Sequence, residues 1–285
     1  MEASLSLRAR IARPELLFVP AVFDAMSALM AERAGFLAAY VGGATLGYLR
    51  AATEAALTPH DFVQTGIDIR SASRLPLVMD GGVGWGDPMH VRRTIRLAEA
   101  GGYDAIELED QVAPKRAHHH VGVEHLVPIE EMVAKIAEAV RARRNPDLLI
   151  IARTNAVRRA MDDALRRCDA YAGAGADMLF PIADKPEDRR ILGARAPLPL
   201  AQMVFPGESF TRMNLSPDDL VQLNYRMLID GITPFTRQFE ALDAAYREMR
   251  GVPAEAAATY AIMERANDLV GLPDLLEIEL RTTER

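Results

Sequence analysis

Polar residues that could do chemistry stand at the ends of short apolar runs. Asp80 and Glu109 each end such a run, and Arg153 ends another. Carboxylates are the ligands that a hard cation such as Mg²⁺ takes, and the cation would polarise the oxygen of a 2-keto or 2-hydroxy acid. An arginine binds a carboxylate through a fork of two hydrogen bonds, and the Gly42–Gly43 amides suit a second anionic oxygen. The full set is Tyr40, Gly42, Gly43, Asp80, Glu109, Asp110, Arg153, Asn155, Gln202 and Asp230.

Structural roles are open for the same residues. Asp80 could cap a helix, and Glu109 could begin a solvated loop. Arg153 could pair with Glu107, which shares a strand face with Glu109 and needs a partner if it is buried. Cys168, the single cysteine, lies in a helical pattern and is predicted to be a core residue in a reducing cytoplasm.

Three consecutive histidines follow a lysine and an arginine in the stretch DQVAPKRAHHHVG, residues 110–122. Helical metal pairs need i, i+4 spacing, so a zinc site at His118, His119 and His120 is not favoured. Two interpretations stay open. The stretch is either a solvated loop or a gating loop whose histidine transfers a proton, since imidazole is an acid or a base near neutral pH.

Eight short apolar runs alternate with helical patterns, which predicts a (β/α)8 barrel. The rival is an open doubly wound sheet, but the count of eight and the lack of a glycine-rich turn after the first run favour the barrel. The runs cover residues 16–20, 37–42, 75–80, 104–109, 148–153, 177–182, 198–204 and 225–230. The helical patterns cover residues 24–35, 90–102, 128–144 and 161–175, and further helices are expected within 235–285. We expect one domain over 1–285, with its active site at the carboxyl ends of the strands.

The composition excludes several classes of protein. The chain has 285 residues, is 49% hydrophobic and carries a formal net charge of −7, which disfavours nucleic acid as a partner. The first residues lack the apolar core of a signal peptide, and no run approaches the roughly 18 apolar residues of a membrane span. A cytoplasmic enzyme acting on small molecules fits these features.

Several stretches resemble the isocitrate lyase/phosphoenolpyruvate mutase superfamily over about residues 10–250, and the pair IELEDQVAPKR and IIARTNA is the most specific. The resemblance implies a (β/α)8 barrel, usually a tetramer that is a dimer of dimers with a swapped C-terminal helix. It implies Mg²⁺-assisted cleavage or formation of C–C or P–C bonds through an enolpyruvate-like intermediate. It also implies roles: catalysis by Lys115, Arg116, His119 and Arg153, substrate contacts from Tyr40, Gly42, Gly43, Asp80, Arg153 and Gln202, and a metal on Asp80 and Glu109.

The chain departs from the family pattern at several of these places. Gly82 replaces the second metal-site carboxylate, Ile182 replaces a glutamate, and Asn155 replaces an aspartate. A further aspartate of the family pattern is either missing from the segment LRAATEAAL, residues 49–57, or replaced there by Glu54. Mg²⁺ can bind a site with fewer carboxylates, because it often needs only one or two of them. The cysteine that isocitrate-type lyases carry in the loop is Ala117, so 2-methylisocitrate lyase activity is not expected.

The sequence thus favours a lyase or decarboxylase that acts on a small 2-keto or 2-hydroxy dicarboxylic acid. A phosphonopyruvate-type hydrolase or mutase is the first alternative. The second is a catalytically weakened barrel that binds a carboxylate ligand without turnover.

Overall fold

Eight parallel strands form a nearly closed barrel in the computed structural model, which describes residues 5–205, 207–210, 212–251, 259–269 and 271–284. The strand order is β1-β8-β7-β6-β5-β4-β3-β2, and a bridge between Ala21 and Tyr40 brings the two outer strands together. All eight predicted strands and the barrel are confirmed. The strands are β1 (Leu17–Pro20), β2 (Ala39–Val41), β3 (Leu77–Asp80), β4 (Ala105–Glu109), β5 (Leu149–Thr154), β6 (Met178–Pro181), β7 (Leu200–Met203) and β8 (Tyr225–Asp230).

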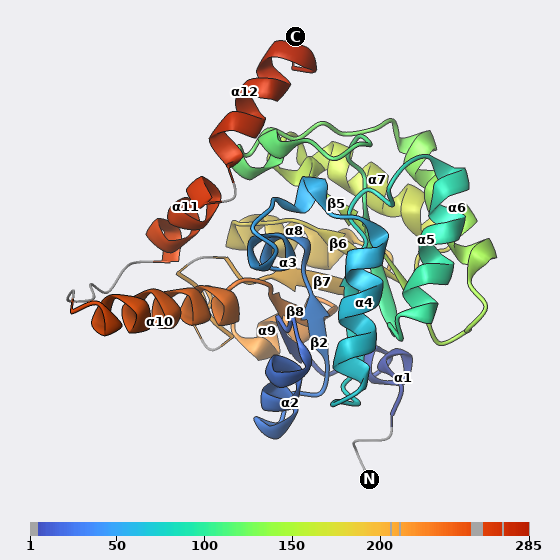
Figure 1. Ribbon diagram of the computed structural model, residues 1–285. Coiled ribbons are helices and arrows are strands. Elements are labelled where there is room, and N and C mark those ends of the chain that lie inside the picture. The colour runs from blue at the N-terminus through green and yellow to red at the C-terminus, as the bar shows by residue number, and fades with distance from the viewer. Residues whose placement is uncertain (1–4, 206, 211, 252–258, 270, 285) are drawn as a thin grey trace.

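Helices surround the sheet (Figure 1). The four predicted helices appear as α2 (Ala25–Arg33), α5 (Pro88–Ala100), α6 (Ile129–Ala142) and α7 (Met161–Gly173). The others are α1 (Leu7–Ile11), α3 (Gly43–Leu49), α4 (Pro59–Arg70), α8 (Pro186–Arg195), α9 (Pro217–Gln222), α10 (Thr233–Met249), α11 (Thr259–Leu269) and α12 (Leu272–Thr282). The described residues also include the short 3-10 helices η2 (Glu54–Ala56), η3 (Ala117–Val121) and η4 (Ala156–Arg158). Local signals fix the ends of α5: the Asp87 side chain accepts the N–H of Met89, and Gly102 follows the helix at φ +78°.

The strands separate two apolar layers because successive side chains point to opposite faces. On β4, Ala105 packs inside the barrel, whereas Ile106 and Leu108 pack against the outer helices. Glu107 and Glu109 share the inner face with Ala105 and are fully buried. Cys168 is buried in the outer layer, as predicted.

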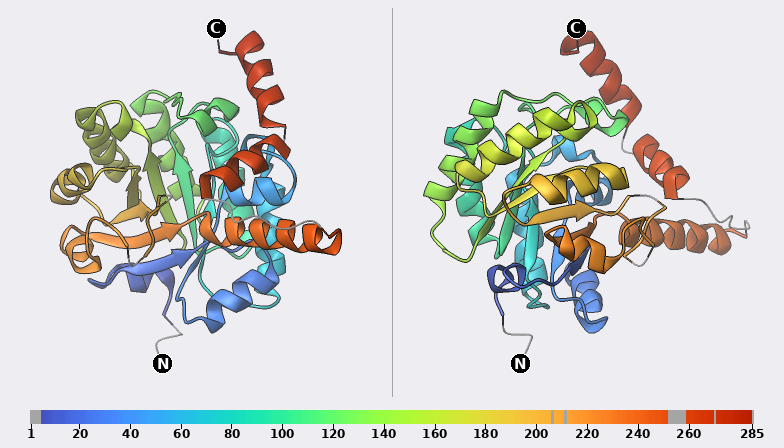
Figure 2. Two further views of the ribbon diagram at one scale, coloured as in Figure 1. Left: turned by 90° about the vertical axis from the view of Figure 1, so that its left-hand side faces the viewer. Right: turned by 180° about the vertical axis from the view of Figure 1, so that it is seen from behind.

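The C-terminal helices α10, α11 and α12 extend outside the barrel (Figure 1 and Figure 2). The further helices expected within 235–285 are α10, α11 and α12, and residues 252–258 between α10 and α11 lie outside the described part of the chain. The amphipathic tail is α12, which projects beyond the barrel in both Figure 1 and Figure 2 and packs on η3 of the same chain. Exchange of this helix between subunits stays a prediction. No helix in the described part of the chain is long and apolar enough to cross a membrane.

Candidate active site

A cavity of about 270 Å³, here called the main cavity, opens at the carboxyl ends of the strands. Active sites of (β/α)8 barrels lie at this end. Seven residues proposed from the sequence line the main cavity, together with Glu54 and His120. Those seven are Tyr40, Gly42, Gly43, Asp80, His119, Arg153 and Asn155.

Asp80 ends β3 and is tied to two backbone turns. Its Oδ2 accepts the N–H of Gly43 at 2.9 Å, and its Oδ1 accepts the N–H of Gly82 at 3.0 Å. Gly82 has φ +46°, in the left-handed region that glycine adopts readily. The carboxylate thus holds the N–H of the first residue of α3, whose N-cap is Gly42, so Asp80 is not itself the N-cap considered above. The Gly43 N–H, expected to bind substrate, is donated to Asp80 in this structure.

Arg153 reaches across the barrel to two buried carboxylates. Its Nη1 lies 2.6 Å from Oε1 of Glu107, and its Nη2 lies 3.5 Å from Oε2 of Glu109. The hydroxyl of Tyr40 donates to Oε2 of Glu107 at 3.0 Å. The pairing of Arg153 with Glu107, left open as its structural role, is therefore present. Burial raises the pKa of Glu107 to about 7, against the opposing charge of Arg153.

Lys115 bridges two acids from different elements. Its Nζ lies 2.6 Å from Oε1 of Glu54 on η2 and 2.6 Å from Oε1 of Glu109 on β4. Burial alone would lower the pKa of Lys115, but the carboxylates of Glu109 and Glu54 raise it above its ordinary value. Burial likewise opposes ionisation of Glu54, yet Lys115 lowers the pKa of that carboxyl. The three groups form a charged cluster beside the main cavity.

The three consecutive histidines point to different surroundings. His118 turns away from the main cavity, and its Nδ1 lies 2.8 Å from Oε2 of Glu279 on α12. His119 enters the site, with its Nε2 3.4 Å from Oε1 of Glu54 and its Nδ1 3.1 Å from Nε2 of Gln111. His120 lines the main cavity, and burial lowers its pKa, which favours the neutral ring. The loop is thus folded against the site and is not freely solvated.

Glu124 is a site residue that the sequence did not suggest. Its side chain is 4% exposed, and its Oε2 accepts a hydrogen bond from Nδ2 of Asn155 at 3.1 Å and lies 3.5 Å from Nδ1 of His119. Arg158 approaches its other oxygen at 3.4 Å. Glu124 lies between η3 and α6, far in sequence from any strand end. A search for polar residues at the carboxyl ends of the strands therefore does not identify it. It orients His119 from the side opposite to Glu54.

Other predicted site residues lie outside the main cavity. Arg116 approaches Glu284 at 3.6 Å, so it faces the C-terminal segment. Gln202 is buried and donates its amide hydrogens to the carbonyls of Ala183 and Met203, at 3.0 and 2.7 Å. The catalytic role of Arg116 and the substrate contact of Gln202 remain predictions without support from these contacts.

Asp110 also faces away from the main cavity. Its Oδ2 accepts hydrogen bonds from the Tyr171 hydroxyl at 2.7 Å and from Nη1 of Arg167 at 2.9 Å. Both partners lie on α7, and all three side chains are buried. Asp110 therefore fastens the end of β4 to a helix, which is a structural role.

The described residues contain one group of three whose atoms lie close enough to share a metal ion. His118, Glu279 and Glu284 form it where η3 meets α12. The backbone N–H groups of Ala117 and His118 also donate to Glu279, at 2.8 and 3.1 Å. Contacts between helix and loop thus account for the position of these groups.

Comparisons with known proteins agree with this geometry. Residues 7–250 match the family described as phosphoenolpyruvate phosphomutase. A 2,3-dimethylmalate lyase of Eubacterium barkeri is 32% identical over 98% of both chains, and an oxaloacetate decarboxylase of Chromohalobacter salexigens is 32% identical over 87% of this chain and 85% of its own. The solved structure of a phosphonopyruvate hydrolase in complex with oxalate and Mg²⁺ superposes with a TM-score of 0.76 and 26% identity, and covers 99% of each chain.

Proposed function

The chain belongs to the phosphoenolpyruvate phosphomutase family, and from this premise we propose that it is a carbon–carbon lyase or decarboxylase acting on a small 2-keto or 2-hydroxy dicarboxylic acid. The observation that carries the proposal is the buried charged array of Arg153, Glu107, Glu109 and Lys115 beside the main cavity. An array of this kind, placed where charge develops, stabilises an anionic transition state in a site that excludes water.

Arg153 is the proposed anchor for a substrate carboxylate. It lines the main cavity while two glutamates hold its guanidinium in place, so substrate meets a cation whose position is fixed in advance. Burial and the neighbouring acids Asp80 and Glu107 raise the pKa of Tyr40 well above its ordinary value. Tyr40 therefore stays a neutral hydrogen-bond donor next to that anchor.

The acids of the site fit Mg²⁺. Carboxylate oxygens are ligands for this ion, but Oε1 of Glu54 and Oε1 of Glu109 each lie 2.6 Å from Nζ of Lys115, so a cation bound there would take the place of the ammonium. Asp80 and Glu109 are the residues proposed to hold the ion. When bound, it would polarise the substrate oxygen next to the carboxylate.

His119 is the proposed proton carrier. Oε1 of Glu54 lies 3.4 Å from its Nε2, and Oε2 of Glu124 lies 3.5 Å from its Nδ1. The two carboxylates fix the plane of the ring. A histidine placed in this way can give a proton to the carbon that the departing group leaves behind, or take one from a hydroxyl. In this proposal, His119 transfers the proton in place of the cysteine that isocitrate-type lyases carry where this chain has Ala117.

The test is a turnover screen of oxaloacetate and alkylmalates, with added Mg²⁺ and with EDTA. The proposal expects pyruvate or another 2-keto acid as a product. Absence of turnover for the whole panel would contradict it. The alternative of a phosphonopyruvate hydrolase draws on the solved relative of that name and predicts phosphate release from phosphonopyruvate in the same screen. Stabilisation by oxalate without any turnover would instead indicate a barrel that binds carboxylates.

The proposal extends to assembly as a homotetramer, a dimer of dimers, in the cytoplasm. The exposed Ile278 and Leu280 on α12 support it, because apolar side chains on a projecting helix gain by packing against another subunit. Light scattering of the purified chain tests it, and a monomeric mass would contradict it.

A further inference from the structure

A cluster of two histidines and two glutamates lies where α12 meets the loop after β4. His118 is on η3, His125 precedes α6, Glu279 is on α12, and Glu284 follows that helix. Nδ1 of His118 lies 2.8 Å from Oε2 of Glu279, and Nε2 of His125 contacts Oε2 of Glu284. One atom from each of His118, Glu279 and Glu284 lies within 4.8 Å of the other two. Residues up to 161 positions apart in the chain thus bring ligand atoms into one small volume.

The spacing of these atoms suits a shared ion. Zn²⁺ takes histidine nitrogens and carboxylate oxygens at about 2.0–2.2 Å in tetrahedral geometry, which sets two ligand atoms of one ion about 3.3 Å apart. The pair of His118 and Glu279, now at 2.8 Å, needs to open by about half an ångström to admit the ion. The ion would replace the hydrogen that the imidazole and the carboxylate share, because metal ligands give up their protons on binding.

The charges of the cluster also favour a cation. The side chains of Glu279 and Glu284 are 16% and 13% exposed, so solvent screens them little. The guanidinium of Arg116 lies 3.6 Å from Oε1 of Glu284 and supplies a positive charge there. Glu279 is paired instead with His118, whose ring is charged only when it is protonated. When that ring is neutral, a divalent ion would supply the charge that Glu279 lacks.

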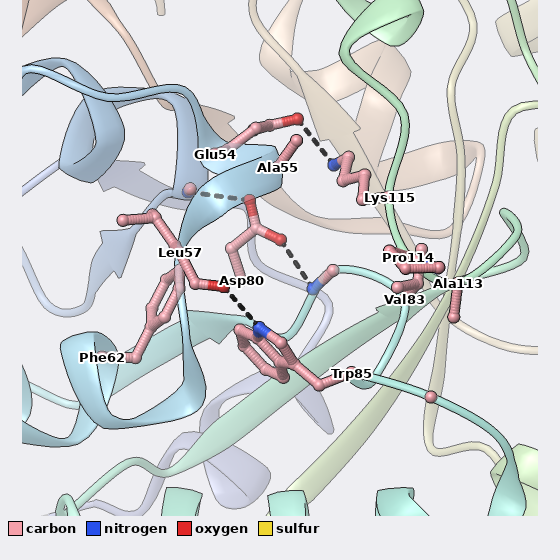
Figure 3. A pocket seen from close by; sticks show the side chains of 13 residues that line it. Glu54, Ala55, Leu57, Phe62, Asp80, Val83, Trp85, Ala113, Pro114 and Lys115 are labelled. Atoms are coloured by element: carbon pink, nitrogen blue, oxygen red, sulfur yellow. Dashed lines mark hydrogen bonds and ion pairs between the residues drawn. The ribbon is translucent and has the colours of Figure 1, made fainter. Parts of the chain in front are cut away.

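The donors of the cluster differ from those of the main cavity. In the main cavity the proposed ligands are carboxylate oxygens, and Lys115 pairs with the neighbouring Glu54 (Figure 3). Mg²⁺ suits such oxygen donors, whereas imidazole nitrogens suit Zn²⁺ and other late first-row ions. Two imidazoles with two carboxylates are therefore a donor set for Zn²⁺.

We infer that His118, His125, Glu279 and Glu284 form a binding site for Zn²⁺, which fastens α12 to the loop that carries His119. The ion adds its bonds to contacts that already join the two segments, such as the N–H of Ala117 that donates to Glu279. Because the ligands converge only when both segments are in place, the free energy of Zn²⁺ binding stabilises their contact. His119 directly follows the ligand His118, so the ion also restrains the backbone of His119.

Co²⁺ is a direct probe, because it takes the place of Zn²⁺ and absorbs visible light far more strongly with four ligands than with six. The experiment titrates the full chain with Co²⁺ in excess Mg²⁺, which competes for the carboxylate oxygens of the main cavity. We expect about one equivalent of Co²⁺ to give intense visible bands and Zn²⁺ to remove them. Absence of such bands, or bands that Zn²⁺ leaves unchanged, would overturn the inference.

Matched variants locate the ion. His118→Asn and Glu284→Gln each remove one ligand and should weaken Zn²⁺ binding about 100-fold or more, measured by calorimetry. The exposed His60→Asn and the exposed Glu277→Gln, which lies on α12, should bind Zn²⁺ as the parent protein does. Unchanged Zn²⁺ affinity in His118→Asn or in Glu284→Gln would overturn the inference.

Hydrogen exchange tests whether the ion ties the two segments together. Saturating Zn²⁺ should slow exchange of the η3 amides about tenfold or more in the parent protein and leave it unchanged in His118→Asn. Equal exchange with and without Zn²⁺ in the parent protein would overturn the fastening of α12 to the loop.

Discussion

The ammonium nitrogen of Lys115 lies 2.6 Å from Oε1 of Glu109, inside the acid cluster proposed to hold a cation. The lysine comes from the loop after β4, and the glutamate ends β4 itself. Both side chains are buried, so the attraction between them is screened little by solvent. A divalent ion that binds Glu109 must therefore compete with the positive charge of Lys115.

Removal of that charge should strengthen metal binding. In Lys115→Met, we expect the dissociation constant of Mn²⁺ to fall at least about tenfold, a difference of about 1.4 kcal/mol. The reason is that Glu54 and Glu109 lose the ammonium that now neutralises them. Calorimetry measures it, and the exposed Lys185→Met is the matched control. Equal or weaker Mn²⁺ binding in Lys115→Met would exclude competition.

His118 and His119 should respond differently to the same substitution. His119→Asn removes the proposed proton carrier, and we expect kcat to fall about 100-fold or more. His118→Asn loses its contact with Glu279, and its effect on kcat should be under about threefold because its ring faces α12. Steady-state kinetics on the best substrate of the screen measures both. Full activity of His119→Asn would remove the role assigned to that residue.

Glu107 should make stability depend on pH. Its folded pKa of about 7 lies above the ordinary value of 4.5, because burial disfavours the charged carboxylate. The folded state therefore binds the proton more tightly than the unfolded state. The resulting stabilisation is fully present below pH 4.5 and is lost as the pH rises through 7.

Glu107→Gln should abolish this contribution. We expect the stability of the parent protein relative to Glu107→Gln to fall between pH 4.5 and 7, by at most about 1.4 kcal/mol per pH unit. Urea unfolding at a series of pH values measures the free energies, and the exposed Glu130→Gln is the control. A difference that does not change with pH would show that burial fails to raise the pKa of Glu107.

The fold could be predicted from the sequence because its signal is local. Parallel strands buried on both faces are continuous apolar runs, such as residues 148–153 before Arg153, and glycines mark the helix ends. Reading the strand ends found Asp80 and Arg153, which line the main cavity, and Glu109, which is buried next to Arg153, for the same reason. Each of these residues is at or next to the end of a run that can be recognised without knowledge of its neighbours.

The remaining site residues depend on how loops fold back, which a single sequence does not encode locally. Glu124 reaches His119 from the segment before α6, and Glu54 reaches Lys115 from a 3-10 helix. The three histidines are equivalent in the sequence, yet their directions differ because η3 turns each ring toward another partner. The interior amide contacts of Gln202 depend likewise on the packing of β7 against its neighbours.

The C-terminal helix should hold the loop that carries the histidines. Glu279 on α12 accepts the N–H groups of Ala117 and His118 at the start of η3. Glu279→Ala leaves those donors without that partner, so we expect hydrogen exchange of the η3 amides to accelerate about tenfold or more. The exposed Glu277→Ala, on the same helix, is the control. Unchanged exchange at η3 in Glu279→Ala would mean that other contacts hold the loop, and a lowered kcat/KM in that variant alone would link α12 to the reaction.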